Sequence, residues 1–279
     1  MTSITHGEIA RLRRGNPELF HRPIPERLRQ WGLWLAFLAA FGYGLWWIDA
    51  NPMRIVEGLN KLGLLVRLMI PPHPGDGLWD YVHAMLETLG MAFLGTVIAA
   101  VVAVPFGFLG AKNVMPNWFF HFTLRRVFDG FRGIDGLVWA LIFVSAVGLG
   151  PFAGVLAIAI GDIPLLSKLF AEAIENIDRK PVEGVRAAGG SGLQVMRLGV
   201  FPQVLPVMMS HVLYFFESNV RSATILGIVG AGGIGLQLSD RIRINNWQAA
   251  AFIILMILVT VAAIDFLSRR LRMKIIEAK

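Results

Sequence analysis

"PVEGVRAAGGSGLQVMRLGVFPQVLP", residues 181–206, is the stretch on which the assignment of the fold rests. It places an acid, a glycine cluster and two spaced prolines between two long apolar runs. Its apolar positions over 182–196 have the spacing of a short amphipathic helix. Pro181 presets a helical φ at the start, and Gly189 with its neighbours permits a sharp break. Because a short helix between two membrane spans is well shaped for a groove of another protein, we predict that it docks in one.

The composition around this stretch is that of an integral membrane protein. Of the 279 residues, 55% are hydrophobic and 16% are charged, whereas soluble domains carry roughly 25% charged residues. A bilayer core of roughly 30 Å needs about 20 apolar residues for each crossing. Runs that lack Asp, Glu, Lys and Arg therefore locate the candidate spans, at 31–48, 88–111, 136–161, 198–216, 222–239 and 244–264.

The run at 136–161 is too long for one crossing. Gly148, Gly150 and Pro151 interrupt it, so we predict two helices that turn at Gly150 and Pro151. One helix would extend back toward Leu124 and the other on toward Ile177. The total is then six or seven spans, depending on whether 222–239 crosses the membrane.

The distribution of basic residues favours six spans. With six, 20 Lys and Arg residues lie in segments assigned to the inside and 6 in segments assigned to the outside, which places both termini in the cytoplasm. A seventh crossing would put the basic cluster at 269–274 outside. The run at 222–239 also holds five glycines, each of which weakens a helix by up to about 1 kcal/mol. We therefore predict an all-α membrane protein with six transmembrane helices and a glycine-rich re-entrant or broken segment.

This topology divides the chain into segments. The stretch at 49–81 has helix-spaced apolar positions, so it either lies flat on the membrane surface or packs on the bundle. The predicted segments are a basic cytoplasmic N-terminal segment at 1–30, a first transmembrane helix at 31–48, an outside interfacial segment at 49–81, one core transmembrane domain at 82–274 and a cytoplasmic tail at 275–279.

Several kinds of site find no support in the sequence. The chain has no cysteine, its histidines never pair at helical spacing, and it has no P-loop. The "GAGGIG" run at 230–235 matches the dinucleotide pattern, but it lies between spans and lacks the acid expected about 20 residues later. The net charge of +7 mostly reflects the cytoplasmic segments, so it does not indicate nucleic acid. We expect no metal or cofactor on this chain, and no means of harvesting chemical energy by itself.

Charged residues at membrane depth are costly and usually face the bundle interior or water. The segment 129–135 spaces two acids around Arg132 on one helical face, and Glu217 and Arg221 have the spacing of an i,i+4 ion pair. One interpretation is that these groups only hold helices together, with Asp265 an interfacial residue. The other is that they line a translocation path. The candidate path residues are Arg132, Asp135, Glu217, Asn219, Arg221, Ser222, Thr224, Gly230, Gly232 and Gly233.

The spacing within 181–206 resembles the EAA coupling loop of ABC importer permeases, whose pattern is an acid, a small residue, a glycine and a distal hydrophobic–proline pair. Gly184 stands where that family usually has alanine. The resemblance implies that Glu183 anchors the loop on an ATPase, Gly189 allows close approach and Pro202 fixes an elbow that transmits motion. The residues implied in ATPase coupling are Glu183, Gly184, Ala187, Gly189, Ser191, Gln194, Pro202 and Pro206.

Two longer stretches, 172–192 and 215–235, look like the permease subunit of phosphonate importers, and the similarity extends from about Val82 to Lys274. The resemblance implies the type I importer permease fold, in the bacterial inner membrane and without enzymatic activity of its own. It also implies a homodimer, two cytoplasmic ATPase subunits that use ATP and Mg, and an extracytoplasmic substrate-binding protein. ATP binding would bring the coupling helices together and rotate the spans.

Other functions stay open at this point. Phosphate, phosphite or another small solute such as methionine are alternative substrates within the same class. An ion-coupled secondary transporter would need a coupling site of its own, and such carriers often show paired broken helices, of which we find one. A membrane-bound enzyme subunit would use the glycine run at 230–235 to bind a nucleotide.

Overall fold

The computed structural model describes residues 24–114 and 118–277, and within these ranges all regular structure is helical. The chain divides into two compact units, Met1–Leu64 and Leu65–Lys279. Most of the predicted N-terminal segment at 1–30 and part of the tail at 275–279 lie outside the described residues.

The first unit contains helix α3, Ile24–Trp47, and most of α4, Pro52–Leu68. Helix α3 contains 31–47 of the segment predicted at 31–48 to be the first transmembrane helix, and it begins earlier, at Ile24. Helix α4 forms where the sequence predicted a helix with one apolar face. Nearly all large apolar side chains of α3 are exposed to solvent within the chain, so this helix needs lipid or another protein to cover them.

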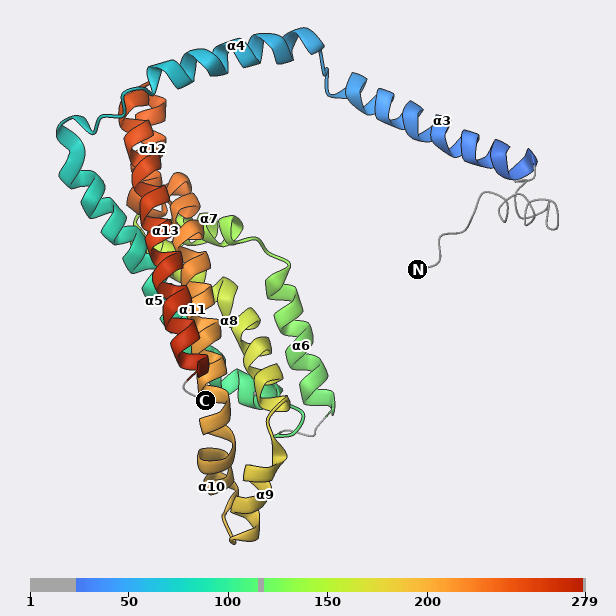
Figure 1. The fold of residues 1–279 in the computed structure, drawn as a ribbon, viewed down its shortest axis with the longest axis vertical. Helices are drawn as coiled ribbons and strands as arrows, with labels where there is room; N and C mark the ends of the chain where they lie inside the picture. Colours follow the sequence, from blue (N-terminus) through green and yellow to red (C-terminus); the bar gives the residue numbers. More distant parts are fainter. Residues whose placement is uncertain (1–23, 115–117, 278–279) are drawn as a thin grey trace, which may run out of the picture. The chain divides into compact units, whose positions relative to one another are not determined.

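The second unit is a bundle of long helices that run side by side (Figure 1). The short helices α9 and α10 lie at one end of the bundle, and α12 lies at the other. The elements of this unit are η1 (Gly75–Gly77), α5 (Leu78–Gly110), α6 (Trp118–Arg132), α7 (Gly136–Val147), α8 (Pro151–Glu175), α9 (Arg179–Ala187), α10 (Gly192–Gln194), η2 (Val195–Val200), α11 (Phe201–Leu226), η3 (Gly227–Ala231), α12 (Gly233–Arg243) and α13 (Trp247–Glu277).

Four helical stretches of the described chain are long and apolar enough to cross a membrane, at 75–110, 151–175, 192–231 and 247–275. The pair α6 and α7 makes a fifth if the two helices, bent by 81°, count as one span. Helix α3 is not among them, because tryptophan and tyrosine lower its hydropathy although both residues are typical of membrane interfaces. The predicted total of six spans therefore stays a prediction.

Close packing of α5 against α8 organises the bundle. Small residues recur at every fourth position of α5 from Gly95 to Gly107 and so share one helix face. A methyl group added to Gly95 would overlap the side chain of Ile158, and one added to Gly107 would overlap Phe170. Small residues of this spacing allow two membrane helices to approach closely, and we did not recognise this stripe in the sequence.

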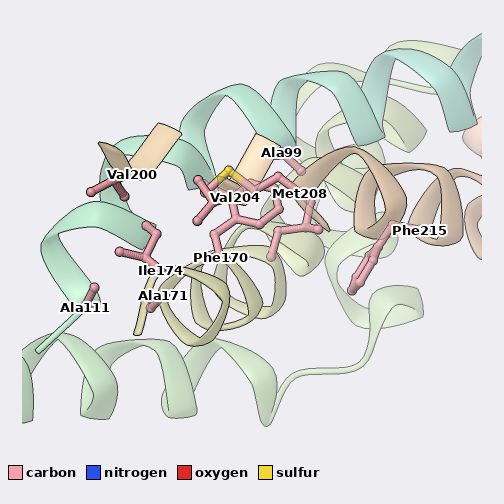
Figure 2. Packing of buried hydrophobic residues seen from close by; sticks show 11 residues of the cluster. Ala99, Ala111, Phe170, Ala171, Ile174, Val200, Val204, Met208 and Phe215 are labelled. Atoms are coloured by element: carbon pink, nitrogen blue, oxygen red, sulfur yellow. The ribbon is translucent and has the colours of Figure 1, made fainter. Parts of the chain in front are cut away.

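The largest cluster of buried apolar residues joins three of the long helices. It brings together Ala99 of α5, Phe170 of α8, and Val204 and Met208 of α11 (Figure 2). The cluster also includes Ile174 and Val200, and the partly buried Val182 of α9 packs against it, so this core connects α9 directly to the long helices.

The predicted turn at Gly150 and Pro151 is present, but one of its two helices is shorter than expected. Gly148 and Gly150 have φ of +94° and +133°, a region that favours glycine, and α8 begins at Pro151. Helix α7, however, begins at Gly136 and does not extend back to Leu124. The chain bends there because Asp135 caps α7, its side chain accepting a hydrogen bond from the Leu137 N–H at 2.8 Å.

The glycine-rich segment is a broken helix, as predicted. Gly230, Gly232 and Gly233 have φ of +101°, +78° and +70°, so the chain turns sharply between η3 and α12. Helix α5 stabilises the start of α12: one amide there donates to the Glu87 carboxylate at 3.2 Å, and the next donates to Thr88 Oγ1 at 2.8 Å. The break therefore lies packed in protein, which is where irregular backbone is tolerated at membrane depth.

Candidate functional site

The coupling helix predicted in 181–206 is α9, and it has defined caps at both ends. Asp178 lies at its N-terminus and accepts a hydrogen bond from the Lys180 N–H at 3.0 Å. At its C-terminus, Gly189 has φ of +79° and donates to the Arg186 carbonyl at 2.9 Å, while Gly190 donates to the Val185 carbonyl at 3.0 Å. This pair of bonds is a Schellman motif, which requires the left-handed conformation at Gly189.

The amphipathic helix predicted over 182–196 is broken at the glycines, where the sequence permits a sharp break. Helix α9 stops at Ala187 because the Schellman motif terminates it. Ser191 then starts the next helix in a capping box: the Gln194 N–H donates to Ser191 Oγ, and the Ser191 N–H donates to Gln194 Oε1 at 2.7 Å. Ser191 and Gln194 thus have a clear structural part in starting the helix that enters the membrane.

The outer face of this loop is not covered by any of the residues that the structure describes. Helix α9 contains no buried residue, and Glu183, Gly184 and Ala187 are all exposed. Leu193 is 84% exposed. The inner face of α9 packs on η2 (Val195–Val200). Gly199 of η2 lies so close to Val182 that a methyl group added to Gly199 would be 3.1 Å from the Val182 Cα.

The two prolines lie in a helix that continues into the membrane. Pro202 has no N–H, and just before it the Phe201 N–H donates to the Met196 carbonyl, five residues back. Because Pro202 supplies no backbone N–H, the helical hydrogen bonds here can shift to carbonyls five residues back. The segment η2, Val195–Val200, is accordingly a π-helical turn. Pro206 lies one turn later, inside α11. The elbow predicted at Pro202 is therefore a wide turn in one continuous helix.

A second cluster of charged residues connects α11 with α13. One Arg221 nitrogen donates to both carboxylate oxygens of Asp265, at 3.1 Å each. The Glu217 carboxylate accepts from Arg272 at 2.7 Å and lies 3.8 Å from Arg221. The ion pair predicted between Glu217 and Arg221 is present at 3.8 Å. The sequence did not predict that Arg221 also binds Asp265, a contact that forms because α13 packs on this face of α11.

Asn219 lies on a different face of α11 from Arg221. Its side chain is 6% exposed and donates to Thr96 Oγ1 of α5 at 2.9 Å and to the Asp162 carboxylate of α8. Thr96 and Asp162 are 1% and 9% exposed. These three polar groups join the three central helices at membrane depth, and Thr96 and Asp162 were not among the predicted site residues.

The remaining path candidates do not form one site. Ser222 and Thr224 hydroxyls donate to backbone carbonyls one turn earlier in α11. Arg132 lies 3.9 Å from Asp129 at the end of α6, whereas Asp135 belongs to the cap of α7, so the predicted shared helical face is wrong. The glycines of the turn line a cavity of about 370 Å³ whose other residues include acidic groups. Its polar and glycine lining is Asp80, His83, Glu87, Gly150, Gly230, Gly232, Gly233 and Gln237.

Comparison with known proteins gives a consistent assignment. Residues 103–277 match the family described as "Binding-protein-dependent transport system inner membrane component". The phosphite transport system permease protein PtxC of Stutzerimonas stutzeri is 37% identical over 238 residues, which are 85% of this chain and 85% of PtxC. PhnE2 of Escherichia coli, named as a cryptic phosphonate transport system permease protein, is 51% identical over 117 residues, which are 42% of this chain and 96% of PhnE2.

A solved structure supports the same fold. The MetNI methionine ABC transporter, in an inward-facing conformation, has a chain that superposes with a TM-score of 0.65 at 24% identity, covering 73% of this chain and 99% of that one. This likeness concerns the fold, and the family match concerns the class of protein. The chain is therefore a membrane permease with the type I ABC importer fold and belongs to the family of binding-protein-dependent transport system inner membrane components.

Proposed function

We propose that this chain is the membrane-spanning subunit of an ATP-driven importer that carries a phosphonate, or a related phosphorus oxyanion, into the cytoplasm. The observation that carries the proposal is the exposed helix α9, which lies between α8 and α11 in the chain and has an outer face that no described residue covers. A helix presented in this way fits a groove of a partner. The partner would be an ABC ATPase. It would supply the energy of ATP hydrolysis, since this chain has no P-loop of its own.

The coupling loop provides the contacts for that partner. Glu183 is exposed on α9 and would anchor the docked helix through hydrogen bonds or an ion pair. Gly184 and Ala187 add little bulk to the same surface, so a partner can approach the α9 backbone closely. Two ATPase subunits, each with ATP and Mg, would act on two copies of the permease. A soluble binding protein would deliver the substrate at the extracytoplasmic side.

The substrate class rests on the relatives and on one basic group. Named relatives transport phosphite or phosphonate, and Arg221 is half exposed on the α11–α13 face. A guanidinium held by Asp265 at membrane depth would stabilise a passing oxyanion, which competes with the carboxylate for the same donors. The Asp80 and Glu87 carboxylates beside the glycine turn make that cavity a poorer place for an anion.

The direct test is co-purification. The tagged chain, co-expressed with its neighbouring genes, would be extracted in mild detergent and its bound proteins identified by mass spectrometry. We expect a stoichiometric ATPase. Glu183→Ala should lower ATP-dependent uptake by at least tenfold while the permease still folds, because an anchoring contact at the docked surface is lost. Glu57→Ala, an exposed glutamate of α4, is the matched control.

Other outcomes would redirect the assignment. A chain that purifies alone and moves solute in ATP-free vesicles is a secondary transporter. Normal uptake by Glu183→Ala removes Glu183 from the coupling contact. Uptake that is unchanged in Arg221→Gln, with assembly intact, removes Arg221 from the path. Binding assays with phosphonate, phosphate, phosphite and methionine on the co-encoded binding protein decide between the substrates.

A further inference from the structure

Gln203 joins the two ends of the coupling loop. It lies in the first turn of α11, between Pro202 and Pro206, and its side chain reaches the residue that precedes α9. Its Nε2 donates to the Asp178 carbonyl at 3.1 Å, and the Asp178 N–H donates to its Oε1 at 3.1 Å. Nε2 also donates to the Gly199 carbonyl at 2.6 Å. Gln203 and Asp178 are 25 residues apart in the chain.

These contacts restrain orientation as well as distance. A single hydrogen bond allows two groups to rotate about it, whereas a reciprocal pair between an amide side chain and the N–H and C=O of one residue restrains the orientation of both. Asp178 is also the N-terminal cap of α9, with its carboxylate on the Lys180 N–H. The start of the coupling helix is therefore fixed to the first turn of α11 through one residue.

The other connections between α9 and α11 are weaker in this respect. Val182 and Gly199 are in van der Waals contact, which resists compression but not sliding. The segment from Ala188 to Ser191 is a turn rather than a helix. Without the Gln203 contacts, α9 could rock on η2 while the rest of the bundle stayed in place.

We propose that Gln203 is the positioning residue that makes the coupling helix α9 and the membrane helix α11 move as one body. This inference rests on the proposed function, since it concerns how motion at the ATPase surface reaches the membrane. Gln203 does not itself touch the ATPase: its side chain is partly buried and points toward Asp178 and Gly199. Force applied to α9 is passed through Asp178 to Gln203 and then to α11.

Only a primary amide satisfies all three contacts. Asp178 presents one donor and one acceptor, and Gly199 presents a second acceptor, so the side chain at 203 must both donate and accept. Methionine has the same length without these hydrogen bonds. Glutamate keeps the acceptor for the Asp178 N–H but turns a carboxylate oxygen toward two carbonyls. Asparagine keeps the chemistry and is one methylene shorter.

The experiment compares Gln203→Met, Gln203→Glu and Gln203→Asn in the full complex of permease, ATPase and binding protein in proteoliposomes. Gln248→Met is the control, since Gln248 is an exposed glutamine at the start of α13. One readout is hydrogen exchange at the Asp178 amide. The other is the number of ATP molecules hydrolysed for each substrate taken up, a ratio that a loss of protein stability alone would leave unchanged.

We expect the Asp178 amide to exchange about tenfold faster in Gln203→Met than in the wild type, because its acceptor is gone. The ATPase should still co-purify, and the ratio of hydrolysis to uptake should rise several-fold. Gln203→Glu should keep most of the protection of the Asp178 amide and still raise the ratio, since the two carbonyls lose their donor. Gln203→Asn should lie between the wild type and Gln203→Met, and Gln248→Met should match the wild type.

Different results overturn different statements. Unchanged exchange in Gln203→Met overturns the statement that Gln203 restrains Asp178. A normal ratio of hydrolysis to uptake despite fast exchange overturns the role of Gln203 in coupling. If Gln203→Met does not fold, a normal ratio in Gln203→Glu overturns the coupling role in its place. A wild-type chain that binds no ATPase overturns the proposed function itself, whereas the results above with a bound ATPase overturn this inference alone.

Discussion

Asn219 shows how much one side chain can hold together. It is the one donor recorded for the Asp162 carboxylate among the described residues and also binds Thr96, so it joins α5, α8 and α11 inside the bundle. We predict that Asn219→Leu lowers the free energy of unfolding by about 1–3 kcal/mol, the range for leaving buried polar groups without partners. Thermal unfolding in detergent measures this change.

The control for Asn219 is Ser222→Ala on the same helix. Ser222 donates only to a carbonyl of its own helix, Ser218, at 3.3 Å. Removing the Ser222 hydroxyl should therefore change the midpoint temperature of unfolding little. Equal midpoints for wild type and Asn219→Leu would mean that the three buried groups do not stabilise the bundle.

Two glycines of the coupling loop should respond in opposite ways to alanine. Gly189 has φ of +79°, so Gly189→Ala should destabilise the end of α9 by about 1 kcal/mol. Gly184 lies within the exposed helix, where an added methyl group meets nothing within 4 Å, so Gly184→Ala should stabilise α9 by about 0.5–1 kcal/mol. Hydrogen exchange of the 179–190 amides measures both changes, and the same sign for both would contradict the cap geometry.

At the scale of elements, the contact between α5 and α8 depends on small residues. We predict that Gly107→Ala lowers the free energy of unfolding by about 1–3 kcal/mol, because the added methyl group would overlap Phe170 and push the helices apart. Gly90→Ala is the matched control on the same helix, since a methyl group there meets nothing within 4 Å. It should be neutral or slightly stabilising.

The outcome for this pair is read from melting temperatures of the purified variants. A Gly107→Ala variant as stable as Gly90→Ala would mean that the two helices separate without cost.

The same reasoning applies where α12 approaches α11. A methyl group on Gly235 of α12 would overlap the Thr224 carbonyl of α11, so this close approach also needs a residue without a side chain.

At the scale of the whole molecule, the bundle presents a large apolar surface. Only 17% of the most apolar window of α13 and 33% of that of α5 are buried within the chain. Lipid or a partner protein would cover the rest, since water would not stabilise such a surface.

Orientation can be tested because the chain has no cysteine. Leu193, which is 84% exposed, lies in α10 at the end of the bundle with α9, and Trp79, which is 80% exposed, lies in the first turn of α5 at the other end. We predict that Leu193→Cys reacts with an impermeant maleimide only from the cytoplasmic side and Trp79→Cys only from the outside. Labelling of both from one side would contradict the predicted topology.

Much of the fold followed from the sequence. Charge-free apolar runs located the long helices, the glycine and proline pair at 150 and 151 located a turn, and the glycines at 230–233 located the break. These features are local: hydrophobicity over about 20 residues and the φ freedom of glycine do not depend on distant contacts. The loop at 181–206 was singled out differently, through the resemblance of its acid, glycines and prolines to a coupling loop, and its role in coupling stays a prediction.

What only the tertiary structure decided is which distant groups meet. Arg221 binds Asp265 on α13 as well as Glu217 on its own helix, Asn219 turns inward to Asp162, and Gln203 reaches Asp178. Sequence spacing identifies neighbours on one helix, but partners on another helix depend on how both rotate when their small and large residues pack. For this reason the sequence by itself determined the helices and the class of protein, whereas packing determined the polar contacts that hold the helices together.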